Sequence, residues 1–232
     1  TDSSGSASST AGFSISTYTG AGSSLDIVVK HGLSVKPAVM WTRNRDDANS
    51  WAVYHHKNTS APETDYLKLD TTAATADQAE IWHDTEPTSA VFTAGDHSSS
   101  NRSGDNFVSY HWNEVQGFSK FGSYTGNGNA NGPFVYTGFR PAMVIIKNSS
   151  ATGNWEIFDT KRSTYNLMHA TLYADTTGAE YTGTGNQIDV LSNGFKVRNE
   201  DTNTNDSGET TVFMAFAEQP FVNSNGVPAN AR

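Results

Sequence analysis

Runs that alternate between hydrophobic and polar positions cover much of the chain. Residues 154–159 (NWEIFD) place Trp155 and Ile157 on the same side of an extended backbone. A period of two is the pattern of a β-strand whose two faces have different surroundings. Apart from the final Lys147, the runs 38–41 (AVMW) and 142–147 (AMVIIK) are apolar instead, which is typical of strands buried on both faces. The pattern therefore predicts β-structure throughout.

Clusters of Gly, Asn, Ser and Asp separate the predicted strands, for example at residues 43–50, 148–154 and 199–209. No stretch of a dozen residues has a convincing helical period. The best candidate for a helix, residues 63–82, is weakened by its threonines. Several short strands per hundred residues, separated by such turns, indicate an all-β fold made of antiparallel β-sandwich, jelly-roll-like domains.

Three blocks of sequence occur twice, in the same order. The matching blocks are 12–22 with 117–128, which has one inserted residue, 36–55 with 140–159, and 103–114 with 207–218. Trp155 follows Trp51 by 104 positions, and Pro141 follows Pro37 by the same distance. Blocks that recur in one order at a nearly constant offset indicate an internal duplication.

The duplication predicts the domain organisation. We expect a first β-sandwich repeat at residues 12–116 and a second at residues 117–222. Residues 1–11 are polar and without periodicity, so they are predicted to be an arm or linker. Residues 223–232 are predicted to be a C-terminal tail.

Charge and composition narrow the class of protein. The formal net charge is -9, from 24 acidic and 15 basic side chains, which argues against a nucleic-acid-binding surface. No apolar run approaches the roughly 20 residues that span a bilayer, so no membrane insertion is expected. The chain has no cysteine, which excludes disulfides and thiol chemistry. Its abundant hydroxyl and amide side chains resemble those of extracellular or virion β proteins.

A glycine-rich stretch, residues 124–134 (YTGNGNANGPF), raises the question of a phosphate-binding loop. Gly126, Gly128 and Gly132 are spaced one residue too widely for the dinucleotide fingerprint, and a strand-like sequence follows where a helix is required. The matching stretch in the first repeat, residues 18–24 (YTGAGSS), keeps only part of the pattern. We therefore predict a tight turn, in which glycine permits a positive φ.

No catalytic or cofactor motif is found. The seven histidines are scattered without a metal-binding spacing, and the nucleophile-elbow pattern of serine hydrolases is absent. Asp84 and Glu86 are two carboxylates that lie close together in the sequence, but this pair has no counterpart in the second repeat. We expect no enzymatic activity, no cofactor and no metal centre.

One acidic loop invites comparison with a calcium site. Residues 200–209 place Asp201, Asn203 and Asn205 at the first three ligand spacings of an EF-hand, but Asp206 stands where the loop needs glycine. The closing glutamate is also missing. We predict a solvated hairpin loop, with weak calcium binding as the alternative.

The tryptophans have two interpretations. Trp51 and Trp155 occupy matching positions and are predicted to anchor the core of each repeat. Trp41, Trp82 and Trp112 are the candidate stacking platforms for a sugar ring, because an aromatic face complements the C–H face of a sugar.

The chain resembles a repeat found near the C-terminus of large structural proteins of marine bacteriophages, often tail fibre or tail proteins. The segments that carry the resemblance are 117–128 (GFSKFGSYTGNG), 132–142 (GPFVYTGFRPA), 191–196 (LSNGFK), 214–221 (MAFAEQPF) and 226–232 (GVPANAR). The second repeat matches best, and the first departs from the pattern in its loop at residues 40–51 (MWTRNRDDANSW). The resemblance supplies no catalytic residues.

The resemblance implies a virion structural protein, either part of a tail fibre or a head fibre or decoration protein, on the virion surface. Its expected partners are other copies of itself, with a trimer as the typical state of fibres, and other virion proteins. The alternative is a carbohydrate-binding adhesin that recognises a host-surface glycan. A polysaccharide depolymerase is a third candidate.

Overall fold

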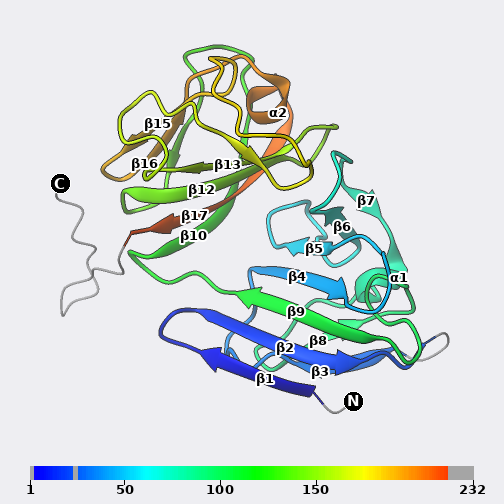
Figure 1. Ribbon diagram of the computed structural model, residues 1–232. Helices are drawn as coiled ribbons and strands as arrows, with labels where there is room; N and C mark the ends of the chain where they lie inside the picture. Colours follow the sequence, from blue (N-terminus) through cyan, green and yellow to red (C-terminus); the bar gives the residue numbers. More distant parts are fainter. Residues whose placement is uncertain (1–2, 23–25, 219–232) are drawn as a thin grey trace. The chain divides into compact units, whose positions relative to one another are not determined.

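The computed structural model describes residues 3–22 and 26–218 and is all-β, with 42% of the chain in strands and 4% in helices (Figure 1). It divides into two compact units. The first consists of Thr1–Asp70 and Thr75–Asn113, and the second of Thr71–Ala74 and Glu114–Arg232. The all-β prediction is confirmed. The predicted C-terminal tail at 223–232 lies outside the described residues.

The main sheet of the first unit has seven strands. Their order across the sheet is β1 (Ser3–Ser8), β2 (Phe13–Thr19), β9 (Asn106–Trp112), β4 (Val39–Asn44), β5 (Ala52–His55), β6 (Asp65–Lys68) and β7 (Ala76–Asp77), and every neighbouring pair is antiparallel. A second, two-stranded sheet pairs β3 (Ile27–Lys30) with β8 (Val91–Ala94), and a short helix, α1 (Ala79–Trp82), precedes β8. The candidate helix at 63–82 is therefore wrong except for its last turn.

Strand β1 replaces the predicted arm or linker at residues 1–11. Ser3 pairs with Tyr18 and Ser8 with Phe13, so the strand extends the sheet along β2. Its residues are small, and most are polar and exposed. Because Ala7 is its one apolar side chain, this strand has no hydrophobic period that sequence reading could detect.

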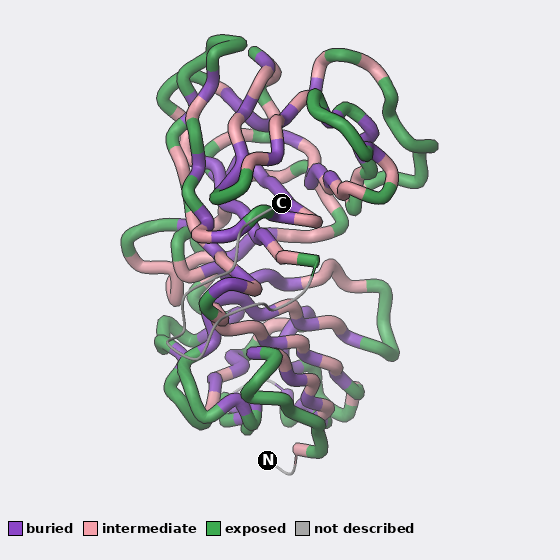
Figure 2. Tube along the Cα trace, turned by 90° about the vertical axis from the view of Figure 1, so that its left-hand side faces the viewer, coloured by how far each residue is buried: buried purple, intermediate pink, exposed green. Residues whose placement is uncertain are grey.

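The core of the first unit lies between its two sheets. Alternation along the strands sends Tyr18, Met40, Tyr54 and Phe107 from the main sheet toward the small sheet and α1. There they join a cluster of buried apolar residues from those elements: Ile27, Val29, Phe92, Ala94, Ile81 and Trp82. Buried positions recur along the strands, while the loops are largely exposed (Figure 2).

The second unit also combines a main sheet with a small one (Figure 1). The main sheet has the order β10 (Ser119–Thr125), β17 (Thr210–Ala217), β12 (Pro141–Asn148), β13 (Trp155–Asp159) and β14 (Leu172–Tyr173). The small sheet has the order β11 (Phe134–Tyr136), β16 (Gly194–Val197) and β15 (Ile188–Leu191), and α2 (Thr202–Asn205) precedes β17. The core again lies between the sheets, with Val144, Ile146, Phe158 and Phe213 facing Phe195.

Strand pairing in the two main sheets follows one register. Val39 on β4 pairs with both Trp112 and His55. Met143 on β12, 104 positions later, pairs with both Phe216 and Asp159, which are also 104 positions later. No helix in the part of the chain that the structure describes is long and apolar enough to cross a membrane.

Candidate functional site

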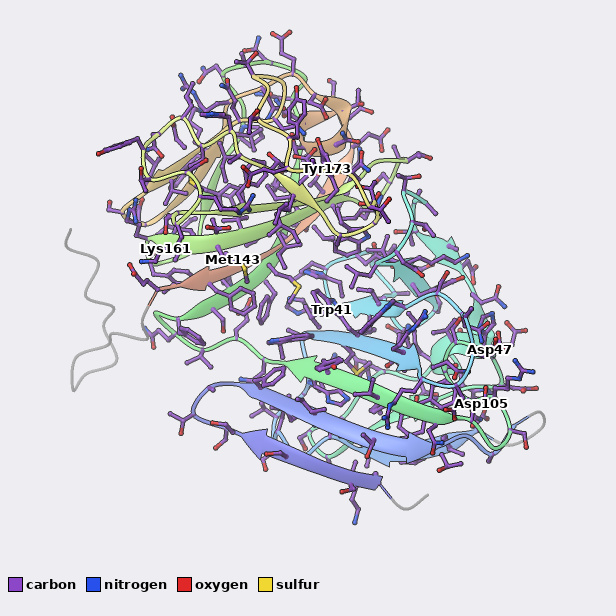
Figure 3. All side chains as sticks on the ribbon, in the orientation of Figure 1. Trp41, Asp47, Asp105, Met143, Lys161 and Tyr173 are labelled. Carbon is purple, nitrogen blue, oxygen red and sulfur yellow. The ribbon has the colours of Figure 1, made fainter. Side chains whose placement is uncertain are left out.

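A buried asparagine organises the loops at one end of each unit. In the first unit the Asn44 side-chain oxygen accepts hydrogen bonds from the backbone amides of Asp46 (2.9 Å) and Asp47 (3.1 Å). Its amide nitrogen donates to the Ser98 carbonyl (3.2 Å) and to the Asp105 carboxylate (2.7 Å). Asp47 and Asp105 accordingly lie at the same end of this unit (Figure 3).

The second unit contains the same arrangement. The Asn148 side-chain oxygen accepts from the amides of Ser150 (3.1 Å) and Ala151 (3.0 Å), and its nitrogen donates to the Thr202 carbonyl (2.9 Å). Both asparagines are buried. A buried amide is costly unless its donors and acceptors are paired, so this residue fixes three loop positions at once.

A tyrosine and a second asparagine hold the next loop. The Tyr18 hydroxyl donates to the Ser100 carbonyl (2.7 Å), as Tyr124 does to Thr204 (2.6 Å). Asn101 accepts a hydrogen bond from the Ala21 amide (2.8 Å). Its counterpart Asn205 accepts one from the Asn127 amide (2.9 Å).

The glycine-rich stretch belongs to this loop. A Cβ on Gly20 would lie 2.1 Å from the Arg102 carbonyl oxygen, and one on Gly126 would lie 2.1 Å from the Asp206 carbonyl oxygen. Gly128 has a φ of 62°. Close backbone approach and a left-handed conformation thus explain these glycines, as the turn prediction requires.

Two histidines in the first unit stand where the second has aspartates. His97 Nδ1 accepts from the Ser99 amide (3.0 Å), while Asp201 Oδ1 accepts from the Asn203 amide (2.8 Å). In the same way His55 Nδ1 accepts from the Lys57 amide (3.1 Å). Asp159 Oδ1 accepts from the Lys161 amide (2.9 Å). A neutral imidazole nitrogen and a carboxylate oxygen perform the same capping here.

The acidic loop at residues 200–209 differs from its predicted form. Asp201 caps α2, whose residues Thr204 and Asn205 are fully buried, so the solvated hairpin loop is wrong. Asn203 Oδ1 accepts from the Asn154 amide (3.1 Å), and Asn205 bonds the neighbouring loops. These side chains are engaged with the protein backbone and do not converge on one point. Among the residues that the structure describes, no group of three or more His, Asp or Glu is placed to hold a metal ion.

A serine and two histidines are buried in the core of the first unit. Ser14 Oγ lies 3.2 Å from His111 Nδ1, and the His31 ring lies 5.6 Å from the His111 ring. Burial, together with the smaller effect of the neighbouring His31, lowers the pKa of His111 to about 3. Ser14 and His111 are both fully buried, so a substrate cannot reach this pair. We interpret it as a polar part of the core.

The second unit buries an acid and a base on opposite faces of its main sheet. Burial raises the pKa of Glu156 well above its usual range, and the charge of Asp201 raises it further. Glu156 Oε1 accepts a hydrogen bond from Asn186 (2.8 Å). Burial also lowers the pKa of Lys147 to about 8. Its Nζ donates to the carbonyls of Gly153 (2.8 Å) and Thr72 (3.2 Å).

The structure separates the three tryptophans proposed as sugar platforms. Trp82 is 1% exposed and packs in the core of the first unit, so it cannot stack on a ligand. Trp41 on β4, labelled in Figure 3, and Trp112 on β9 are half-buried. Both lie on the face of the main sheet opposite the core, because each is next in its strand to a buried residue of the core side, Met40 or His111. The two tryptophan rings lie 4.8 Å apart, and Phe13 lies 5.2 Å from Trp112.

The predicted core anchors, Trp51 and Trp155, are not part of the apolar cluster between the sheets of either unit. Trp51 is half-buried, with the Arg43 guanidinium 5.8 Å from its ring centroid. Trp155 is buried and pairs with Lys147 on the outer face of its sheet. Because Phe158 points into the core, the alternation of β13 places Trp155 on the other side.

Other aromatic side chains are far more exposed than the tryptophans. Phe134 is 47%, Tyr136 64% and Tyr165 84% exposed. The sequence carried a signal for the first two, because Phe134 and Tyr136 flank Val135 in a strand-like alternation. The sequence does not tell, however, which face of the strand at residues 134–136 packs against the core.

Residues 1–220 match a family described as a domain of unknown function (DUF7483), and the chain belongs to this family. The match extends across both compact units. Neither the comparison with curated proteins nor the comparison with solved structures found a match.

Proposed function

We propose that the two units are tandem copies of one jelly-roll-like β-sandwich, produced by duplication of a single ancestral repeat. The support comes from the loop bonds as much as from the strands. Asn44, Asn101 and Tyr18 bind the same backbone positions as Asn148, Asn205 and Tyr124. Unrelated sandwiches share strand order more readily than a set of side-chain to backbone bonds.

We further propose that the protein is a non-enzymatic structural component of a virion, a part of a tail fibre or of a head fibre or decoration protein. The observation that carries this proposal is the repeated loop scaffold. In both units the polar side chains of the loops are directed to the protein backbone, which is the arrangement of a rigid building element. The resemblance to phage structural proteins is the reason for placing this element in a virion.

Immunogold labelling of purified phage particles tests the proposal. We expect label on the tail or the head surface, together with a homo-oligomer by light scattering of the purified protein. Label that stays in the soluble fraction of the lysate, combined with a monomeric mass, would contradict it.

The second candidate function is that of an adhesin that binds host-surface glycan. Exposed aromatic side chains favour it, because such rings are costly to leave in water and are suited to sugar faces. It is compatible with the first proposal, since a virion surface protein can carry a receptor-binding surface. Binding of the purified protein to defined oligosaccharides tests it.

A further inference from the structure

The outer face of the small sheet in the second unit presents two neighbouring aromatic rings. Alternation along β11 sends Val135 into the core and leaves Phe134 and Tyr136 on the opposite side. Since β11 is at the edge of the three-stranded sheet, both rings border solvent. They are adjacent on one face because residues i and i+2 of a strand point the same way.

A loop segment extends this sheet beyond β15. Met168 and Ile188 exchange backbone hydrogen bonds of 2.9 and 3.1 Å. The Asn166 side chain pairs with the backbone of Val190 through two further bonds of 2.9 Å. Residues 166–168 therefore lie alongside β15.

The register of these pairings gives the order of side chains across the face. One row runs Tyr136, Gly194 and Leu191, and the next runs Phe134, Lys196 and Asp189. The exposed Tyr165 and Leu167 belong to the segment that adjoins β15. Phe134 leans over Gly194, because its Cε2 atom lies 3.1 Å from the position that a Cβ on Gly194 would take. In the second row the cation Lys196 lies between Phe134 and the anion Asp189. We call these eight residues the aromatic face.

The charged residues within this face offer both kinds of hydrogen-bonding group. Asp189 contributes carboxylate oxygens, and Arg198 Nε lies 3.4 Å from Asp189 Oδ2. The Lys196 ammonium donates to the Gly132 carbonyl (2.7 Å), which uses one of its three N–H groups. Donors and acceptors thus lie side by side between the exposed rings.

The fold does not need these rings. In the first unit the strands β3 and β8 place Val28, Lys30, Thr93 and Val91 on the corresponding outer face, without an aromatic residue. The two units nevertheless have the same arrangement of core strands. Leaving large apolar side chains in water is unfavourable, so the rings of the second unit point to a ligand.

We propose that the aromatic face binds a neutral oligosaccharide of pyranose units. The rings of Phe134 and Tyr136 stack against the C–H faces of the sugar, and Tyr165 supports the far side of the chain. Sugar hydroxyls donate to Asp189 and accept from Lys196 and Arg198. A neutral polyol fits this mixture of charges, whereas an anionic or cationic polymer would meet a like charge. The inference rests on the second candidate function and gives it a site other than Trp41 and Trp112.

Isothermal titration calorimetry of the whole chain with maltohexaose, cellohexaose and chitohexaose tests this site. We expect at least one of the three to bind the wild-type protein. Replacing both rings, Phe134→Ala with Tyr136→Ala, weakens that binding by roughly tenfold or more, which is the loss expected for two stacking contacts. Tyr165→Ala gives a smaller loss. The matched control is Tyr181→Ala, an aromatic residue of the same unit that is 37% exposed and outside the aromatic face.

The outcomes separate the site from the function. Binding that survives the double replacement but is lost in Trp112→Ala would overturn the aromatic face and leave the adhesin function standing. If none of the three sugars binds the wild type, both this site and the adhesin function fail, while particle labelling still decides the virion proposal. A double replacement that changes the oligomeric mass and leaves sugar binding intact would make the face a contact between copies and overturn the proposal.

Discussion

Individual glycines and asparagines determine the loops of this protein. Asn44 and Asn148 each bind three or more backbone or carboxylate groups from inside the fold. Gly20 and Gly126 let one backbone segment approach another within a distance that no side chain permits. The glycine-rich stretch that suggested a phosphate site therefore has a steric purpose.

Replacing Gly126 with alanine tests that purpose. The new Cβ would lie 2.1 Å from the Asp206 carbonyl oxygen, which belongs to the backbone and moves only with its loop. We expect the free energy of unfolding to fall by about 1–3 kcal/mol, as overpacking usually costs. Chemical denaturation measures the change.

Gly178→Ala is the matched control for Gly126→Ala. The only atom that its Cβ would approach within 4 Å is Thr176 Oγ1, at 3.6 Å, and we expect a change within about 0.5 kcal/mol. Equal effects of the two replacements would show that close approach is not what Gly126 provides.

At the scale of residues, the sequence predicts the spacing between matching glycines and asparagines, but it does not predict which tryptophans are buried. The offset of 104 residues relates the asparagines, and an offset of 106 relates Gly20 to Gly126, because both residue types are set by backbone geometry. Trp82, Trp41 and Trp112 are indistinguishable in the sequence. Trp82 is buried because α1 packs against Phe92 and Tyr54, and no local pattern reports such a contact.

At the scale of elements, alternation is informative only where one face is apolar. β12 and β13 follow their predicted patterns, because each contributes to the core. β1 has a single apolar side chain, Ala7, and α2 is a single capped turn whose buried residues are Thr204 and Asn205. Polar burial of this kind leaves no hydrophobic period, so both elements were missed.

Lys147 on β12 connects two further segments of the second unit. Its ammonium group donates to the carbonyls of Gly153 and Thr72, and the Gly153 amide also donates to Thr72 (2.9 Å). Residues 71–74 belong to this unit through such contacts, although their sequence neighbours on either side belong to the first.

Replacing Lys147 with methionine keeps the length of the side chain and removes both donated bonds. A carbonyl left without a partner in a buried site costs about 1–3 kcal/mol. We expect the Gly153 amide and residues 71–74 to exchange hydrogen faster in the variant, as measured by hydrogen exchange with mass spectrometry. Lys161→Met, which removes an exposed ion pair with Glu218, is the control and leaves this exchange unchanged. Unaltered protection at Gly153 in the Lys147 variant would contradict the assignment.

At the scale of the whole molecule, the two units differ in the groups that their interiors hold. The first buries His31 and His111 and half-buries His97, and burial lowers the pKa of each, to about 3 for His111. Nearby charges modulate the pKa of His97, raised by Glu80 and Asp96 and lowered by Lys68. The second unit buries Glu156, whose pKa is raised. Burial therefore makes it harder to protonate the histidines of the first unit and easier to protonate Glu156 of the second.

Acid should destabilise the first unit before the second. An unfolded histidine titrates near pH 6.5, and these folded histidines titrate lower, so between the two values the unfolded state binds more protons. Stability is then present above about pH 6.5 and is lost as the pH falls, by up to about 1.4 kcal/mol per pH unit for each such histidine. Glu156 has the opposite sign, because its raised pKa makes the folded state the better proton acceptor.

Hydrogen exchange at pH 7 and pH 5 measures the difference between the units. We expect protection to fall first in β2, β4 and β9, while β12 and β17 keep theirs. His111→Ala, which introduces the residue type that Ala215 supplies at the matching position, reduces the pH dependence. The exposed His169, replaced by alanine, leaves it unchanged. Equal loss of protection in both units at pH 5 would refute the assignment.

The paired asparagines also have a consequence for how the chain tolerates change over generations. Apart from the Asp105 carboxylate, which accepts from Asn44, their partners are peptide groups, so most substitutions elsewhere do not remove the bonds. Under the duplication proposed above, interior positions such as Ala52 and Glu156, or His111 and Ala215, have diverged without disturbing the loops. Because the loops are held by bonds to the backbone, the residues inside each unit are the ones whose identity is free to vary.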